Sequence, residues 1–148
     1  MTKEEPTIPV IVYVSGPYTK PDPASNVVSA IRVADTLSGV SRKVGFITVK
    51  LYPFIPHLSH FWGNLFPKPY DYWLEIDRVF ISRSDCLLVI PGESKGVGIE
   101  IEDSSQKGIP IFLLPPEYSK DDILEKGNQI VDSFCDLSRF GSRVGRKR

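Results

Sequence analysis

The amino-acid sequence predicts an α/β fold: a three-layer sandwich of the Rossmann or flavodoxin type, built on a mostly parallel sheet of four or five strands. Short apolar runs that suit buried strands alternate along the chain with longer stretches whose apolar residues recur at helical spacing. Two of these runs, residues 10–14 and 86–90, are each followed by a small-residue turn and a helical stretch. Strands that alternate with helices in this way form a parallel sheet with helices packed on it.

Length and composition indicate one domain over residues 1–148, which is long enough to bury a sizeable core. The 18 basic and 18 acidic residues cancel, so no bulk charge attracts the chain to nucleic acid or to a membrane surface. No apolar run approaches the roughly 20 residues that span a bilayer. Residues 1–9 are polar, lack a signal-peptide core and are expected to be a loose leader, so we expect a cytoplasmic protein.

The first third of the chain is predicted to form a strand, a helix and a second strand. Residues 10–14 are β-branched and aromatic, which is typical of a central strand. After a proline-rich loop, Asn26 is a suitable cap for a helix that runs to about residue 38, and Gly39 follows its end. Residues 45–52 are expected to form the next strand.

The segment 53–69 is dense in proline and aromatic residues. It is too long and too apolar for an idle solvent loop, so we interpret it as a lid or wall over a cleft, or as a subunit contact. After it, Asp71 is expected to cap a helix over about residues 72–82. Residues at helical spacing are expected to form the buried face of this helix: Trp73, Ile76, Val79 and Phe80.

The stretch 84–114 reads as strand, glycine loop, helix and strand, which is the crossover unit of a parallel sheet. Its first strand contains Cys86, which we expect to be a small buried residue and not half of a disulfide. The helix is expected from about Val97 to Gly108, and a second buried strand over residues 109–114.

The C-terminal part of the chain is predicted to hold one more helix and a basic tail. The helix candidate covers residues 121–137, with five apolar residues on its inward face: Ile123, Leu124, Ile130, Val131 and Phe134. Residues 138–148 are basic and contain no acid. We interpret them as a solvated tail, so a nucleic-acid partner is not expected.

The glycine loop 94–98 marks the expected functional site, because ligands bind at the carboxyl ends of parallel strands. Gly96 and Gly98 allow the backbone to approach a ligand closely, and a helix N-terminus presents free N–H groups to an anion. Glu100 is expected in the first helical turn, where the helix dipole favours its ionised form. Such a carboxylate can act as a nucleophile or base. The alternative is that Glu100 is only a favourable first-turn charge, since two acidic residues nearby carry the same charge.

Tyr13, Ser15 and Gly16 end the first strand and are expected to face this loop, forming a crevice for a phosphate or a sugar. Tyr13 has a second interpretation as a core aromatic. Asp77 lies at the edge of the apolar stripe of its helix, so its carboxylate is either half-solvated or aimed at a site. Neither G-x-G-x-x-G nor G-x-x-x-x-G-K-[ST] is present, so neither a nicotinamide cofactor nor a P-loop ATPase is indicated, and no cofactor is expected.

His57 and His60 have a spacing that would suit metal ligands on one helix face. The loop context around Pro56 weakens this interpretation, and no third ligand with suitable spacing is visible. We therefore expect packed or hydrogen-bonded histidines and no metal site.

Four sequence features together resemble the nucleoside 2-deoxyribosyltransferase superfamily, including its 2'-deoxynucleoside 5'-monophosphate N-glycosidases. They are the opening strand Val12-Tyr13-Val14-Ser15-Gly16-Pro17-Tyr18-Thr19, Asp77 eight residues before Asp85, the run Ser94-Lys95-Gly96-Val97-Gly98-Ile99-Glu100, and the turn Lys107-Gly108-Ile109-Pro110-Ile111. The likeness covers roughly residues 10–114, and the order and spacing of the four features carry it.

The resemblance implies an enzyme that breaks the N-glycosidic bond of a nucleoside or nucleotide, by hydrolysis or by transfer to a second base. Glu100 would attack the anomeric carbon, Asp77 would move a proton to or from the base or orient the sugar, and Tyr13 would orient Glu100. Family members that act on free nucleosides commonly have an aspartate where Ser94 stands, and a serine suits a 5'-phosphate instead. The expected substrate-binding residues are Ser15, Gly16, Tyr18, Ser94, Gly96, Gly98 and His57.

The resemblance also implies a homodimer or higher homo-oligomer, in which Phe61 and Trp62 would supply apolar contact area. Two alternative functions stay open. The first loop has no arginine, and Lys20 is its nearest cation, so the chain is alternatively a non-catalytic nucleotide-binding or sensor module. The same glutamate chemistry also suits cleavage of a dinucleotide such as NAD.

Overall fold

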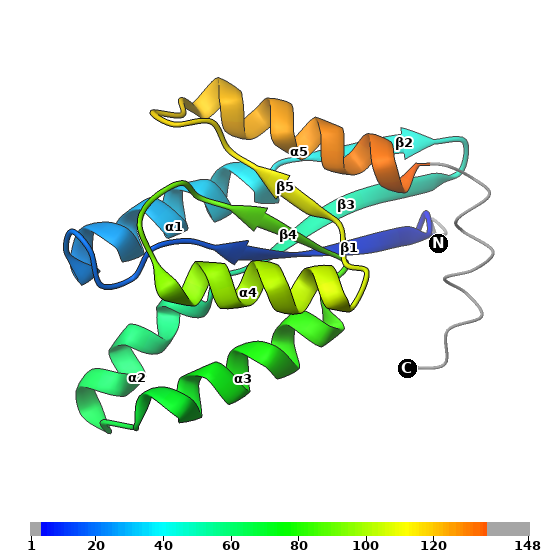
Figure 1. The fold of residues 1–148 in the computed structure, drawn as a ribbon. Helices are drawn as coiled ribbons and strands as arrows, with labels where there is room; N and C mark the ends of the chain where they lie inside the picture. Colours follow the sequence, from blue (N-terminus) through cyan, green and yellow to red (C-terminus); the bar gives the residue numbers. More distant parts are fainter. Residues whose placement is uncertain (1–3, 136–148) are drawn as a thin grey trace.

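The computed structural model describes residues 4–135, which form an α/β fold with one five-stranded sheet and five α-helices (Figure 1). The strands are β1 (Thr7–Ser15), β2 (Ser41–Val44), β3 (Ile47–Phe54), β4 (Cys86–Val89) and β5 (Ile111–Leu113). The helices are α1 (Pro23–Ser38), α2 (Ser59–Leu65), α3 (Tyr70–Arg83), α4 (Lys95–Gln106) and α5 (Lys120–Phe134), with a short 3₁₀ turn, η1 (Pro56–Leu58), before α2.

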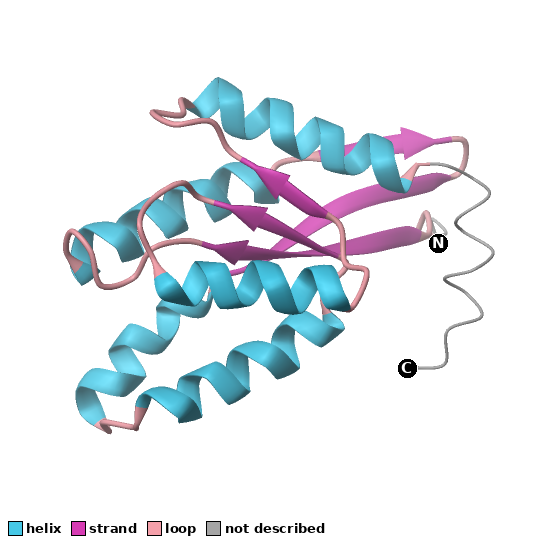
Figure 2. Ribbon diagram, viewed as in Figure 1, coloured by secondary structure: helices cyan, strands magenta, loops and turns pink. Residues whose placement is uncertain are grey.

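The sheet has the strand order β2-β3-β1-β4-β5, and all neighbours are parallel except β2, which pairs antiparallel with β3. The prediction of a mostly parallel α/β sheet is therefore confirmed. The sheet is strongly curled, however, and the helices around it do not form a clear three-layer sandwich (Figure 2). The arrowheads of β1, β4 and β5 point to the same edge, where β1 and β4 lead toward α1 and α4 (Figure 1).

Apolar residues fill both faces of the central strands, as expected for a parallel sheet that is covered by helices. On one face, Val10, Val12 and Val14 of β1 pack with apolar residues of α1 and α5. On the other face, Tyr13 packs with residues of β4, α3 and α4. Side chains alternate along a strand, so Tyr13 and Ser15 lie on the same face of β1, opposite the three valines.

Two strand boundaries differ from the expected ones. β1 begins at Thr7 and pairs with β3 from that residue onward, so the expected leader is wrong for residues 7–9. The strand expected over residues 45–52 is the second half of a hairpin, because β2 precedes it and the chain turns at Gly45. The φ of Gly45 is +64°, a left-handed conformation that glycine adopts easily. The four residues of β2 are too few and too polar to give a clear strand pattern.

The start of α1 also differs from the prediction. Asp22 is the N-cap, and its carboxylate accepts hydrogen bonds from two backbone N–H groups of the first turn. Asn26, the predicted cap, lies inside the helix. Its side-chain amide donates to the carbonyl oxygens of Tyr18 and Lys20 at 2.9 and 2.8 Å, and thereby holds the loop between β1 and α1.

The aromatic segment 53–69 is largely helical, because it contains the end of β3, then η1 and α2. The ring of Trp62 on α2 lies 5.3 Å from that of Trp73 on α3, centroid to centroid. α2 and α3 therefore lie side by side, below α4 in the view of Figure 1.

The prediction for α3 is wrong in two respects. Asp71 lies in its first turn and is not its cap. The predicted buried face is also incorrect, since Val79 is 57% exposed and Phe80 is exposed, whereas Ile81 is buried. Phe80 stacks on Phe54 of β3, with 4.4 Å between the ring centroids.

The second half of the chain is close to the prediction, except that the buried strand expected over residues 109–114 is the three-residue β5, none of whose residues is buried. β4 contains Cys86, which is buried as expected and is not part of a disulfide, and α4 begins two residues before the expected start. A reciprocal capping box between Ser119 and Asp122 starts α5, and four of its five predicted inward residues are buried. The expected tail, 138–148, lies outside the described residues. Over residues 4–135, none of the helices is long and apolar enough to cross a membrane.

Candidate active site

α4 carries Glu100 to the end of β1. Ser94 is the N-cap of this helix, and its Oγ accepts a hydrogen bond from the backbone N–H of Val97 at 3.3 Å. Glu100 is the sixth residue of α4 and lies in its second turn. The expected position in the first turn, with support from the helix dipole, is therefore wrong. The side chain of Glu100 is only 8% exposed.

Two hydroxyl groups on the same face of β1 hold this carboxylate. The Tyr13 hydroxyl donates to Oε1 of Glu100 at 3.1 Å, and the Ser15 hydroxyl donates to Oε2. Both donors are fully buried. Burial, and then the charge of Glu100, raise the pKa of Tyr13 far above its ordinary value, so its hydroxyl stays protonated and remains a donor. The interpretation of Tyr13 as a packed aromatic and its expected role as an orienting residue are both compatible with this geometry.

Asp77 of α3 supplies a second carboxyl group close enough to affect Glu100 electrostatically. Burial raises the pKa of Glu100 to about 7, while the Ser15 hydrogen bond opposes this rise and the charge of Asp77 adds to it. Burial also raises the pKa of Asp77 to about 6, against a lowering by the Tyr13 hydroxyl. Two interacting acids with these values titrate as a pair, so the site holds about one proton between pH 6 and 7.

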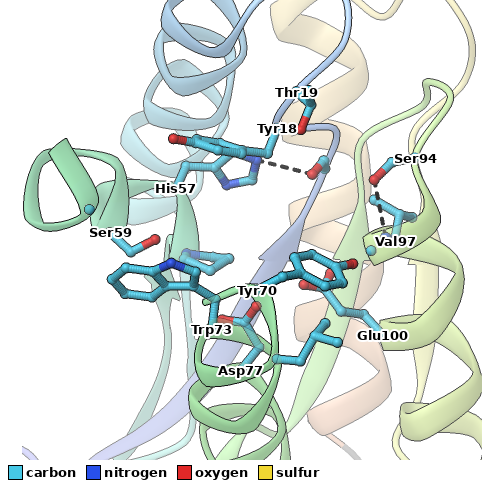
Figure 3. A pocket seen from close by; sticks show the side chains of 15 residues that line it. Tyr18, Thr19, His57, Ser59, Tyr70, Trp73, Asp77, Ser94, Val97 and Glu100 are labelled. Atoms are coloured by element: carbon cyan, nitrogen blue, oxygen red, sulfur yellow. Dashed lines mark hydrogen bonds between the residues drawn. The ribbon is translucent and has the colours of Figure 1, made fainter. Parts of the chain in front are cut away.

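A cavity of about 240 Å³ opens in front of the two carboxyl groups (Figure 3). Asp77 and Glu100 both line it, and Asp77 is also half-buried, so both interpretations of Asp77 are compatible with this geometry. Much of the remaining wall is aromatic, formed by the side chains of Tyr18, His57, Tyr70 and Trp73. A small apolar cavity with a few convergent polar groups is typical of a small-molecule binding site.

Most of the predicted binding residues line this cavity, and two do not. Gly16, Ser94 and Gly96 are in its wall, together with Tyr18 and His57. Ser15 does not line it, because its hydroxyl is buried against Glu100. Gly98 does not line it either, and a Cβ added there would meet no atom within 4 Å. Gly16 has a packing reason to be glycine, since its Cβ would lie 3.1 Å from Ile90.

A second cavity, of about 380 Å³, adjoins the first. The two share five lining residues: Tyr18, Thr19, Tyr70, Ser94 and Gly96. Lys20, Glu93 and Lys95 line only the second cavity. Lys20 lies 3.7 Å from Glu93, and both side chains are largely exposed, so this ion pair is weak. The two lysines outnumber the one glutamate, so the net charge of the residues beside the N-terminus of α4 is positive.

The two histidines form hydrogen bonds, as the sequence predicts. His57 lies with Nε2 3.1 Å from the carbonyl oxygens of both Gly16 and Pro17. His60 lies with Nδ1 2.6 Å from the Tyr18 hydroxyl. Within residues 4–135, no group of three potential ligands is placed to hold a metal ion.

Sequence reasoning missed several residues of the cavity wall. Tyr70 was given no role, and Trp73 was assigned to the buried face of α3. Thr19 and Ser59 also line the cavity without having been predicted. The one sequence signal for this wall is the aromatic segment 53–69, interpreted above as a lid or wall over a cleft. Its pattern does not indicate that the wall continues into α3, where Tyr70 and Trp73 lie.

Comparison with protein-family models, with curated proteins and with solved structures finds no match to this chain.

Proposed function

We propose that this protein cleaves or transfers the N-glycosidic bond of a nucleoside, a deoxynucleoside or its 5'-monophosphate, with Glu100 as the nucleophile. The observation that carries the proposal is a buried carboxylate, held by the hydroxyls of Tyr13 and Ser15, in a cavity that contains a second carboxyl group. The order of Tyr13, Asp77 and Glu100 in the sequence, which resembles the deoxyribosyltransferase superfamily, agrees with this assignment.

In the first step, an ionised oxygen of Glu100 attacks the anomeric carbon of the sugar. The bond from that carbon to the base nitrogen breaks, and its electron pair leaves with the base. Because Glu100 has the higher of the two pKa values, the reactive form is the less populated arrangement of the shared proton, in which Glu100 is ionised and Asp77 is protonated. In this form, Asp77 gives its proton to the departing base. The product is a glycosyl ester of Glu100. Negative charge at Glu100 stabilises the oxocarbenium character of the transition state, as in retaining glycosidases. Tyr13 and Ser15 restrict the rotation of the carboxylate, which keeps the attacking oxygen in position.

In the second step, water or the nitrogen of a second base attacks the same carbon. The ester bond to Glu100 breaks, and the carboxylate leaves with the electron pair. Asp77, now ionised, takes the proton from the attacking group and returns to its starting form. Attack by water gives the free sugar or sugar phosphate, whereas attack by a base gives a new nucleoside.

The surroundings of the two carboxyl groups support a nucleotide substrate. Tyr70 and Trp73 offer aromatic faces to a base or a sugar ring. Ser94, Lys20 and Lys95 line the adjoining cavity, where hydroxyl and ammonium donors suit a 5'-phosphate. We place this activity in the cytoplasm and in a homodimer or higher homo-oligomer, because the exposure of Phe61 and Trp62 suits an apolar subunit contact.

The test is to incubate the protein with a panel of deoxynucleosides, deoxynucleoside 5'-monophosphates and NAD, and to measure the released base by chromatography. We expect release from at least one nucleoside or monophosphate and none by Glu100→Gln. The matched control is Glu102→Gln, since Glu102 is an exposed carboxylate on the same helix. Micromolar binding without release would favour a non-catalytic binding module, and release of nicotinamide alone would favour a dinucleotide glycohydrolase. Equal release by wild type and Glu100→Gln would reject the proposal.

A further inference from the structure

His57 lies in the wall of the cavity with its hydrogen-bonding pattern fixed by the backbone. It belongs to η1, is 4% exposed, and points into the pocket beside Tyr18 (Figure 3). Its Nε2 lies 3.1 Å from the carbonyl oxygens of Gly16 and Pro17. Carbonyl oxygens only accept hydrogen bonds, so Nε2 carries a hydrogen and donates to both.

This arrangement decides the state of the other ring nitrogen. Burial lowers the pKa of His57, so the imidazole is neutral at pH 7 and carries one hydrogen. Because that hydrogen is on Nε2, Nδ1 has a free lone pair and acts only as an acceptor.

Nδ1 is buried and has no hydrogen-bond partner among residues 4–135. The hydroxyl of Tyr18, whose ring lies beside His57, is already bonded to Nδ1 of His60 at 2.6 Å. A buried acceptor without a donor is unfavourable, because it has lost water and gained no replacement. A donor from a bound molecule would remove this cost.

We propose that His57 determines substrate specificity: its Nδ1 accepts a hydrogen bond from a neutral donor on the bound nucleotide, either a sugar hydroxyl or a base amine. This inference rests on the proposed function. It excludes a role for His57 as a proton donor, since its one hydrogen is held by two backbone carbonyl groups. Substrates that lack the donor would leave Nδ1 unpaired and bind more weakly.

Two substitutions separate the proposed role of Nδ1 as an acceptor from the structural role of Nε2 as a donor to the two carbonyl groups. In His57→Gln, the side-chain amide can still donate to the carbonyls of Gly16 and Pro17, but the acceptor at the δ position is lost. In His57→Asn, the side-chain oxygen supplies an acceptor at the δ position, but the donor to the two carbonyls is lost. Both are made in the Glu100→Gln background, so that bound nucleotide is not consumed during calorimetry.

The probes are two pairs of nucleotides that differ by one donor. One pair is a 2'-deoxynucleoside monophosphate and its 2',3'-dideoxy analogue, and the other is deoxyadenosine monophosphate and the purine analogue without the amine. With His57 present, we expect loss of the donor to weaken binding roughly 3- to 10-fold in one of the two pairs, as for a neutral hydrogen bond. In His57→Gln the same change should have less than about a 2-fold effect, and in His57→Asn part of the difference should return.

Unchanged discrimination in both pairs by His57→Gln would overturn the inference while leaving the proposed function intact. Absence of binding by every nucleotide would overturn both. Nitrogen-15 NMR of the protein with Glu100→Gln as its only substitution gives a readout that does not depend on whether the His57 variants fold. We expect an unprotonated Nδ1 whose resonance shifts when the donor-bearing nucleotide binds and shifts less with its analogue. A hydrogen on Nδ1 in the free protein would also overturn the inference.

Discussion

Replacement of Glu100 by glutamine should stabilise the protein at alkaline pH and leave its stability almost unchanged at acidic pH. The pKa of Glu100 is about 7 in the folded protein, against 4.5 ordinarily, because the side chain is buried. The folded state therefore holds the proton more tightly than the unfolded state, and stability falls as pH rises from about 4.5 to 7. Glutamine is neutral at every pH and nearly the same size, so it avoids this loss.

The size of the effect follows from the two pKa values. Each pKa unit corresponds to about 1.4 kcal/mol, so the burial of ionised Glu100 costs about 3 kcal/mol above pH 7. Less than this will be recovered, because glutamine makes weaker hydrogen bonds with Tyr13 and Ser15 than a carboxylate does. At about 2–4 °C for each kcal/mol, the melting temperature at pH 8.5 should rise by roughly 5–10 °C.

The measurement is urea unfolding of wild type, Glu100→Gln and the exposed control Glu102→Gln at pH 4.5 and pH 8.5. The gain should be seen only for Glu100→Gln and only at pH 8.5, while the control should change by less than about 0.5 kcal/mol at both pH values. A Glu100→Gln variant that is less stable than wild type at pH 8.5, or that differs equally at both pH values, would refute the reasoning. A gain in stability with loss of activity is the pattern expected of a functional residue.

Three further predictions concern the site and the loops beside it. Tyr13→Phe should retain the fold but lower kcat roughly 10- to 100-fold, because one hydrogen bond to a charged group is lost. Steady-state kinetics, with circular dichroism to show that the variant is folded, would reveal this loss, and full activity would contradict it. The pH profile of kcat/KM should be bell-shaped with its maximum between about pH 6 and 7, where one acid is ionised and the other protonated. In Asp77→Asn the profile should lose its alkaline limb, because only one of the two acids then titrates; an alkaline limb that remains would argue against the assignment of the profile to this pair. Gly92→Ala should destabilise the protein by about 1–3 kcal/mol in urea unfolding, since φ is +150° and the new Cβ would lie 2.3 Å from a proline ring, whereas Gly98→Ala, which meets no atom, should be neutral or stabilising.

The sequence was sufficient to predict the elements that form the core of the sheet. β1 and β4 are short runs of apolar residues between clear turn signals, and parallel strands that are buried on both faces give this pattern. The glycine loop before α4 and the glycine after it place that helix to within two residues. The position of Tyr13 and Ser15 at the end of an apolar strand, before a small-residue turn, was enough to expect them opposite the glycine loop.

The residues that the sequence failed to place lie where tertiary contacts override local pattern. Val79 and Phe80 have the spacing of a buried helical face, but α3 packs along a different stripe, and Phe80 covers Phe54 at the protein surface. The second-turn position of Glu100 depends on where α4 begins, and helix boundaries are the least certain feature of a pattern. The raised pKa values of Glu100 and Asp77 depend on burial by distant segments, which no local pattern contains.

The alternation along β1 also limits how this protein can diversify. A shift of one residue in the register of β1 would bring Val12 and Val14 against Glu100. It would also move the hydroxyl groups of Tyr13 and Ser15 to the apolar face of the sheet that packs on α1 and α5. Insertions and deletions within this strand are therefore strongly unfavourable, whereas Lys20 in the loop that follows is exposed, so a substitution there leaves the alternation of β1 unchanged. In related chains we therefore expect substitutions in this loop, whereas the hydrogen bonds from Tyr13 and Ser15 to Glu100 should be retained.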